Sequence, residues 1–231
     1  MIPSHDPSVN PEAARRITAV CAKVAIMAQA APLSSSEDAY IAQERLAPTK
    51  SELIHGVIVA MAGASVKHNL IASNISGELR SQLRDRPCIV LGSDQRLCVE
   101  ATGLYTYADV TVVCGPAKFH AKFSDTLINP KLIVEVLSKS TEGYDRGAKF
   151  AHYRRIPSLA EYVLVSQIAR RVEHHRRLET AQWVLTEFEG EAVVELPSLE
   201  AVLKLSEVYA KTDTLATDQD SSGAPGSQDP R

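Results

Sequence analysis

Cysteine is scarce in this sequence, and the few cysteines present are not spaced like metal ligands. The chain of 231 residues contains four, at Cys21, Cys88, Cys98 and Cys114, and no two of them form a C-x-x-C pair. Paired spacing is typical of zinc sites and a high cysteine content of disulfide scaffolds, so we expect neither here. We expect reduced thiols in a cytoplasmic protein.

Long hydrophobic runs are also missing. No stretch approaches the roughly 20 apolar residues that cross a membrane, so no membrane span is predicted. The N-terminal segment loosely resembles an export signal, with Arg15 and Arg16 before an apolar run, but Lys23 interrupts that run. We interpret residues 1–26 as an unstructured leader or upstream extension, with Met27 as the start of the domain.

A surplus of one charge sign is missing as well. Lys and Arg total 25 against 28 Asp and Glu, a formal net charge of −3, so composition does not indicate a nucleic-acid-binding protein. Local basic clusters could still bind phosphates, because counterion release depends on the few cations that touch the backbone. The candidate clusters are Arg80, Arg84 and Arg86; Lys149, Arg154 and Arg155; and Arg170, Arg171, Arg176 and Arg177. Taken singly, each cluster is more typical of a solvated helix or strand face.

The sequence does contain the composition of one globular domain. Hydrophobic residues make up 45% of the chain and charged residues 23%, which suits one sizeable core. Residues 211–231 are polar and rich in Ser, Gly, Asp and Pro, so we expect a disordered tail. The domain is therefore predicted to span residues 27–210.

Interleaved helix and strand patterns predict an α/β fold. Ser35 or Ser36 can cap a short helix, Ser65 a long one, and Ser140 or Thr141 a third. In the long helix one apolar stripe recurs every fourth residue: Ile71, Ile75, Leu79 and Leu83. Strands are predicted at 52–61 (a pair broken by a glycine), 88–91, 96–100, 109–114, 132–137, 161–165, 171–175 and 183–188.

Two carboxylates stand in apolar strands. Asp109 opens the predicted strand 109–114, and Glu135 lies inside the run 132–137. A carboxylate buried there without a partner would destabilise the fold, so each is expected to meet a cation, a metal ion or a hydrogen-bond donor. A structural ion pair is one reading. The other is a Mg²⁺ site, in which two carboxylates leave coordination positions for water and a substrate phosphate.

Five short segments, in order along the chain, resemble a known family. They are SELIHG at 51–56, AMAGAS at 60–65, YADV at 107–110, IVEVLS at 133–138 and YDRGAKF at 144–150. Together they resemble the Uma-type restriction endonucleases of the PD-(D/E)XK nuclease superfamily, over roughly residues 27–209. Each segment is weak evidence alone, but the ordered set is specific.

The resemblance implies a restriction-endonuclease-like fold, with a mixed β-sheet flanked by helices in a single domain. It also implies hydrolysis of nucleic-acid phosphodiesters by a metal-activated water. Asp109 takes the place of the family's motif aspartate and Glu135 that of its second acid, so both are the expected ligands of Mg²⁺ or Mn²⁺. Glu52 matches the early glutamate, which could add a ligand or position water.

The catalytic lysine is displaced from its usual place. In the superfamily it follows the second acid by two residues, but that position here is Leu137. Lys149 is the best candidate, because relatives of this type carry the lysine on the following helix, where Asp145, Lys149 and Tyr153 would share one face. Its alternative is an exposed lysine paired with Asp145. Lys139 is a rival candidate, since strand alternation puts it on the same face as Glu135.

Four further residues are candidates for the outer shell of the site: His68, Asp94, Asp145 and Tyr153. His68 fits a common histidine position of the family but could equally be a surface histidine. Asp94 follows Gly92-Ser93 and is ambiguous between a turn residue and a carboxylate at the edge of the site. Two departures stand out: Ala108 replaces the proline that often precedes the motif aspartate, and Val57 replaces a common second acid, which leaves a weakened activity open.

The sequence thus predicts a Mg²⁺- or Mn²⁺-dependent endonuclease acting on DNA, with a homodimer left open as its assembly. A catalytically silent module that binds nucleic acid or a protein partner is the main alternative, because fold does not fix function. A third reading is a metal-dependent hydrolase of a smaller phosphodiester, for which the same acids and lysine would suffice.

Overall fold

The computed structural model describes residues 34–215. The predicted leader at 1–26 and most of the predicted tail, 216–231, lie outside the described residues. Residues 211–215 also belong to the predicted tail, but they continue the domain: Thr212–Thr214 form a 3₁₀ helix, and Thr212 is buried. No helix of the described part is long and apolar enough to cross a membrane.

A six-stranded sheet forms the centre of the domain. Its order is β11-β10-β9-β8-β6-β3, and only β8 and β9 pair in parallel. The strands are β3 (Cys88–Gly92), β6 (Val110–Cys114), β8 (Leu132–Leu137), β9 (Glu161–Ser166), β10 (Arg171–Arg177) and β11 (Trp183–Glu189). The predicted mixed sheet in a single domain is therefore confirmed, and all six strands were expected from their apolar or alternating runs.

A five-stranded sheet lies beside it, in the order β2-β1-β5-β4-β7. Its strands are β1 (Ser51–Ile54), β2 (Val57–Ala60), β4 (Arg96–Val99), β5 (Leu104–Tyr107) and β7 (Thr126–Leu127). The predicted break between β1 and β2 is a tight turn in which His55 and Gly56 both have positive φ, 49° and 80°. Strands β5 and β7 were not predicted. Neither was the small hairpin of β12 (Val193–Leu196) and β13 (Ala201–Lys204).

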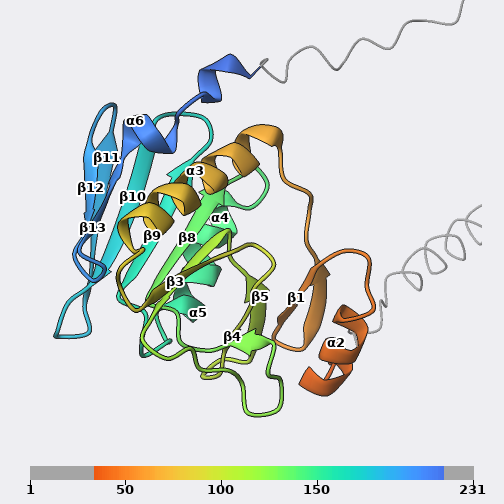
Figure 1. Cartoon of the computed structure of the whole chain (residues 1–231). Coiled ribbons are helices and arrows are strands. Elements are labelled where there is room, and N and C mark those ends of the chain that lie inside the picture. Colours follow the sequence, from red (N-terminus) through yellow and green to blue (C-terminus); the bar gives the residue numbers. More distant parts are fainter. Residues whose placement is uncertain (1–33, 216–231) are drawn as a thin grey trace, which may run out of the picture.

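The long helix α3 (Val66–Gln82) covers one face of the six-stranded sheet (Figure 1). Ser65 caps it as predicted, since the Ser65 hydroxyl accepts from the backbone N–H of His68 at 3.1 Å. The predicted apolar stripe of α3 is buried against valines of the sheet. The hairpin β12–β13 and helix α6 (Leu205–Val208) complete the same core.

The opposite face of the six-stranded sheet packs against the five-stranded sheet and a short helical segment. That segment consists of α4 (Glu142–Tyr144), a π-helical turn (Asp145–Lys149) and α5 (Phe150–Tyr153). The sequence predicted one regular helix here. The wider π turn, common at functional sites, still leaves Asp145, Lys149 and Tyr153 buried. On the outer side, α2 (Glu37–Glu44), capped by Ser36, packs on the five-stranded sheet through Tyr40 and Ile41.

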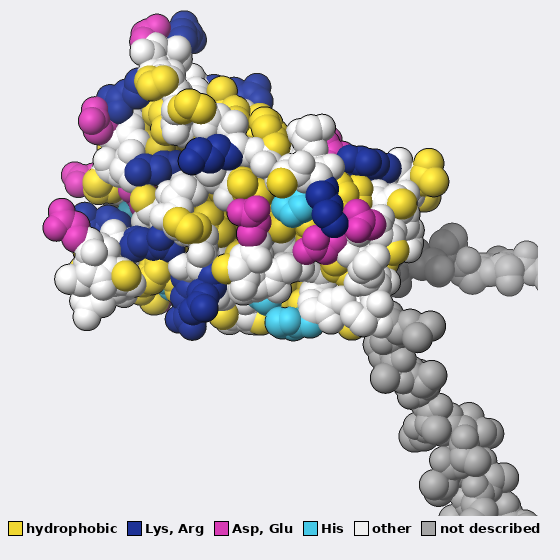
Figure 2. Space-filling view, turned by 90° about the horizontal axis from the view of Figure 1, so that it is seen from below, with side chains coloured by type: hydrophobic (Ala, Val, Ile, Leu, Met, Phe, Trp, Pro, Cys, Tyr) yellow, Lys and Arg dark blue, Asp and Glu magenta, His cyan; other side chains and the backbone are white. Residues whose placement is uncertain are grey.

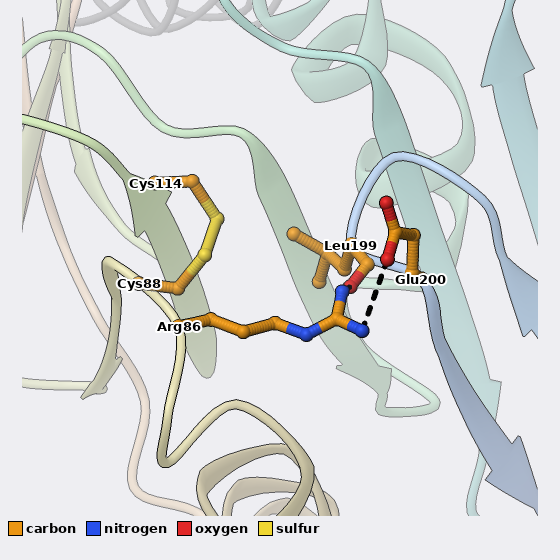
Figure 3. The surroundings of a disulfide bond; sticks show 5 residues. All are labelled: Arg86, Cys88, Cys114, Leu199 and Glu200. Atoms are coloured by element: carbon orange, nitrogen blue, oxygen red, sulfur yellow. Dashed lines mark hydrogen bonds and ion pairs between the residues drawn. A yellow bond between two sulfur atoms is a disulfide. The ribbon is translucent and has the colours of Figure 1, made fainter.

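A disulfide joins Cys88 to Cys114, so the expectation of reduced thiols without a disulfide is wrong for this pair. The two cysteines are 26 residues apart in sequence, a separation that gave no hint of pairing, but β3 and β6 are antiparallel and their register places the two residues opposite each other. Beside the bridge, Arg86 reaches the β12–β13 turn, where its guanidinium donates to the Leu199 carbonyl at 2.6 Å and pairs with Glu200 at 3.0 Å (Figure 3). Bridge and arginine thus stabilise the same end of the sheet.

We expect Cys88→Ser to lower the free energy of unfolding by about 3 kcal/mol in oxidising buffer, because the bridge closes a loop of 26 residues in the unfolded chain. Denaturant titration of both proteins, with and without reductant, measures this. In reductant the two curves should nearly coincide. Equal stabilities in oxidising buffer, or no Cys88–Cys114 cross-link on peptide mapping, would contradict the assignment.

Candidate active site

Glu135 lies in the middle of β8 on the face that meets the α4–α5 segment. Its neighbours on that face, Ile133 and Leu137, belong to the apolar cluster between the two sheets. The carboxylate is 5% exposed. Two donors compensate its burial: the Lys149 ammonium at 2.9 Å and the Tyr153 hydroxyl at 2.9 Å, both on the same carboxylate oxygen. We expected this buried acid to need a partner, and it has two, a lysine and a tyrosine from the helical segment that follows β8.

Lys149 is the centre of the cluster. Its ammonium lies 2.9 Å from Glu135, 3.4 Å from Glu52 and 3.8 Å from Asp145. It also donates to the backbone carbonyl of Tyr107 at 3.3 Å, and the residue is 4% exposed. Burial opposes its charge, but the surrounding carboxylates outweigh burial and hold the pKa of Lys149 well above its usual value. The alternative of an exposed lysine paired only with Asp145 does not hold.

Glu52 enters the cluster from the other sheet. It lies in β1 and is 7% exposed, and its carboxylate accepts from the Thr106 hydroxyl of β5 as well as pairing with Lys149. The neighbouring Ser51 is tied to α2, since its backbone N–H donates to Glu44 at 2.9 Å. Glu52 is therefore held in place by Thr106 of its own sheet and by Lys149, which faces it.

Asp109 stands at the rim of the cluster, immediately before β6. One of its oxygens, Oδ2, accepts from the backbone N–H of Val136 at 2.7 Å and lies 3.1 Å from His68 Nε2. The Val136 contact ties Asp109 to the residue that follows Glu135 in β8. Its side chain is 16% exposed, more than those of Glu52, Glu135 and Asp145. Asp109 is therefore the acid of this set most open to a substrate.

Negative charge exceeds positive charge in the buried part of the site. Glu52, Glu135 and Asp145 share one ammonium, that of Lys149. Burial raises the pKa of Glu135 to about 8, against the opposing effect of Lys149, and also raises the pKa of Asp145. Asp109 adds to the rise in both. The cluster thus favours taking up a further positive charge, either a proton or a cation.

Some of the predicted residues lie outside this cluster. Lys139 is exposed and Leu137 packs in the core, whereas Lys149 lies beside Glu52 and Glu135. Asp94 is a turn residue with its side chain 97% exposed, and it pairs with Lys50 at 3.1 Å. His68 is not a free surface histidine, because its ring faces Asp109 with the side chain 13% exposed.

Sequence reasoning missed two contributors, the Thr106 hydroxyl and the Tyr107 carbonyl. Both belong to β5, a strand of only four residues that was not predicted. Its sequence, Leu-Tyr-Thr-Tyr, is rich in aromatic and β-branched residues and follows a glycine with φ of 67°, which is the available signal for a strand after a turn. The Thr106 hydroxyl binds Glu52 and the Tyr107 carbonyl binds Lys149, but neither contact corresponds to a recognisable sequence motif.

Comparison with known proteins identifies the family of the chain. The Uma2 family, described as "Putative restriction endonuclease", matches residues 38–207. The chain belongs to this family. Two Synechocystis proteins are similar: "Uncharacterized protein sll1609" is 42% identical over 152 residues, 66% of this chain and 86% of that protein, and "Uncharacterized protein slr1290" is 32% identical over 174 residues, 75% and 90% respectively.

The fold of this Uma2 protein also has a solved counterpart. The crystal structure of a "putative nuclease belonging to DUF820" from Anabaena variabilis ATCC 29413 superposes with a TM-score of 0.63. The match covers 75% of this chain and 96% of that one at 19% sequence identity, so the likeness is one of fold. The restriction-endonuclease-like architecture predicted from the sequence is thereby confirmed.

The raised pKa of Glu135 gives a prediction for stability. A glutamate in the unfolded chain has a pKa of about 4.3. Between that pH and about 8, Glu135 therefore keeps its proton in the folded protein but loses it in the unfolded chain. Stability should therefore fall as pH rises through this window. Glu135→Gln cannot titrate and should flatten the slope, whereas Glu100→Gln at an exposed position should not. Thermal melts from pH 5 to 8.5 test this, and an unchanged slope in Glu135→Gln would contradict the pKa assignment.

Proposed function

We propose that this Uma2 protein is a Mg²⁺- or Mn²⁺-dependent endonuclease that hydrolyses phosphodiester bonds of DNA. The observation that carries the proposal is the cluster of Glu52, Glu135 and Asp145 around the Lys149 ammonium, which reaches the surface at Asp109. A purely structural cluster would gain nothing from excess buried negative charge. A site that recruits a divalent cation uses such an excess, and the bound cation would then attract a phosphate.

A divalent ion at this site would be held by two acids and not by a closed cage of side chains. In residues 34–215 no group of three or more His, Cys, Asp or Glu side chains is placed to hold a metal, and the Lys149 nitrogen lies among three of the acids. Mg²⁺ does not need a closed cage, since one or two carboxylates, water and substrate phosphates commonly complete its coordination. We assign Asp109 and Glu135 as the ligands, with Mn²⁺ able to replace Mg²⁺. Bound there, the ion would lower the pKa of a water and polarise the phosphate.

The chain's own residues would divide the remaining work. Lys149 stays protonated because carboxylates surround it, so we assign it to offset negative charge on the reacting phosphate and to orient the attacking water, not to remove its proton. Glu52 and Asp145 position the lysine, and Tyr153 positions Glu135 through its hydroxyl. His68 fixes Asp109 from the α3 side.

The face of the molecule that Figure 2 shows offers DNA no broad basic surface. Seen from below Figure 1, one face of the molecule carries Lys and Arg side chains that are spread out, with hydrophobic and acidic side chains between them (Figure 2). In one of the three predicted basic clusters, Lys149 is buried in the candidate active site and is not on the surface. In another, Arg170 is paired with Glu191 and Asp213. We infer that a few placed contacts hold the substrate.

Asp109→Asn should reduce cleavage of supercoiled plasmid in Mn²⁺ by at least about a hundredfold and weaken Mn²⁺ binding, because it removes an anionic ligand while conserving volume. Asp94→Asn is the matched control, an exposed aspartate outside the site, and should behave as wild type. Equal Mn²⁺ affinity in the two variants would rule out the proposed ligand. A wild type that binds Mn²⁺ and DNA but never cuts would instead favour the silent binding module.

Lys149→Met should abolish cleavage, while Lys139→Met should leave most of it, because only Lys149 reaches Glu52 and Glu135. Removing the ammonium also leaves buried acids without compensation, so Lys149→Met should unfold more readily, by about 3–5 kcal/mol. Cleavage is therefore measured at a temperature where circular dichroism shows the variant folded. An inactive Lys139→Met beside an active Lys149→Met would move the catalytic lysine back to the strand.

A further inference from the structure

A cavity of about 430 Å³ lies between α3 and the turn that follows β3. Asp109 and His68, which belong to the candidate active site, line the cavity, and Arg80 of α3 lines it as well. Glu52, Glu135 and Lys149 do not line it. Asp109 is therefore the acid of the candidate site that faces this cavity.

The cavity is an elongated groove along α3. Its α3 lining includes Asn69, Ser73, Ser76 and Arg80, positions that recur at helical spacing on one face, next to the stripe that packs on the sheet. From His68 to Arg80 the helix rises about 18 Å, at 1.5 Å per residue. One strand of B-form DNA advances about 3.4 Å along the duplex axis per phosphate, and the path along its backbone is longer, so a groove of this length can hold a short run of successive phosphates.

Arg80 is the cation of this groove. Its guanidinium donates to the Val90 carbonyl at 3.2 Å, which steadies the side chain while the residue stays exposed. Within residues 34–215 several arginines are neutralised by acids, as Arg86 is by Glu200 and Arg146 by Glu173, whereas Arg80 is among the arginines that no ion pair involves. A guanidinium has five N–H donors, so Arg80 keeps charge and donors for a phosphate.

Gly77 is the second feature that points to a ligand. It lies near the middle of α3 and lines the groove, although glycine is the poorest helix former apart from proline. A Cβ built on Gly77 would meet no atom within 4 Å, and its φ is not positive. Neither packing nor backbone conformation therefore requires glycine here. Its missing side chain keeps the groove open where a backbone could approach α3.

We propose that this groove seats the sugar–phosphate backbone of the DNA strand to be cut, with Arg80 binding a phosphate several nucleotides away from the one at Asp109. The proposal rests on the proposed nuclease function and adds the path of the substrate. A small phosphodiester would occupy only the Asp109 end. Polar lining suits this occupant, since serines and Asn69 offer hydrogen bonds to phosphate and sugar oxygens.

Binding without cleavage tests the path. A fluorescein-labelled 16-nucleotide DNA, single-stranded and as a duplex, is titrated with the full-length protein in Ca²⁺, and fluorescence anisotropy gives the Kd at several salt concentrations. Arg80→Gln should weaken binding about tenfold and reduce the salt slope by about one. Arg84→Gln is the matched control, an exposed arginine just beyond α3 that does not line the groove, and should change the Kd less than about twofold.

Gly77 separates a ligand-binding role from a structural one. Gly77→Gln replaces glycine by a good helix former and should raise the Tm by a few degrees while weakening DNA binding, because the side chain fills the groove. Gly77→Ala adds a single methyl group, so it should raise the Tm and weaken DNA binding less than Gly77→Gln does. A stabilised Gly77→Gln that binds DNA as wild type does would overturn the proposal.

The remaining outcomes separate this proposal from the proposed function. Equal losses in Arg80→Gln and Arg84→Gln would overturn the groove, since charge alone would then explain binding. So would a wild type that binds neither DNA form. If the groove variants behave as expected but the wild type cuts no DNA in Mg²⁺ or Mn²⁺, the path stands and the nuclease activity fails. If the wild type cuts and the groove variants bind and cut normally, the activity stands and the path fails.

Discussion

The structure depends on one buried ammonium group. Lys149 lies within 4 Å of carboxylates from three elements, namely β1, β8 and the π turn, and donates to a carbonyl of β5. These elements belong to both large sheets and to the helical segment between them. Burying four charged side chains is costly and is tolerated only when they compensate one another, so the same contacts that could serve chemistry also fix how the two sheets meet.

The apolar core explains why this polar cluster has a defined place. Valines and leucines fill both faces of the six-stranded sheet, and Glu135 interrupts the face shared with the second sheet. On that face, Phe150 and Tyr153 of α5 pack against Tyr162 of β9. Asp109, which is held by the β8 backbone and by His68 of α3, lies at the rim of the cluster. The position of α3 on the sheet thus fixes the surroundings of the most exposed acid of the site.

Much of this fold follows from local sequence pattern. Sequence analysis recovered the apolar stripe of α3, the apolar runs of β8 and β9 and the glycine turn after β1. Each of these features is determined by residues close together in the sequence. Glu135 was expected to need a partner because carboxylates are expensive in apolar strands. The ordered motifs identified the acids, and the structure places Glu52, Glu135 and Lys149 together. The register of family motifs, not any local pattern, indicated Lys149.

What escaped sequence analysis depends on distant pairing. The Cys88–Cys114 bridge exists because β3 and β6 are neighbours in one register, which no cysteine spacing reveals. The Thr106 hydroxyl reaches Glu52 only because β5 pairs with β1. The π turn likewise gives no sequence pattern distinct from a regular helix. Asp94 shows the converse, since a carboxylate near the motifs in sequence points to solvent and pairs with Lys50.

We propose above all that Asp109 and Glu135 together hold a divalent ion beside Lys149. The most direct measurement is anomalous scattering from crystals of the wild-type protein soaked in Mn²⁺. We expect one strong manganese peak within coordination distance of a carboxylate oxygen of Asp109 and one of Glu135. A peak at other residues, or no peak between these two acids at saturating Mn²⁺, would contradict it.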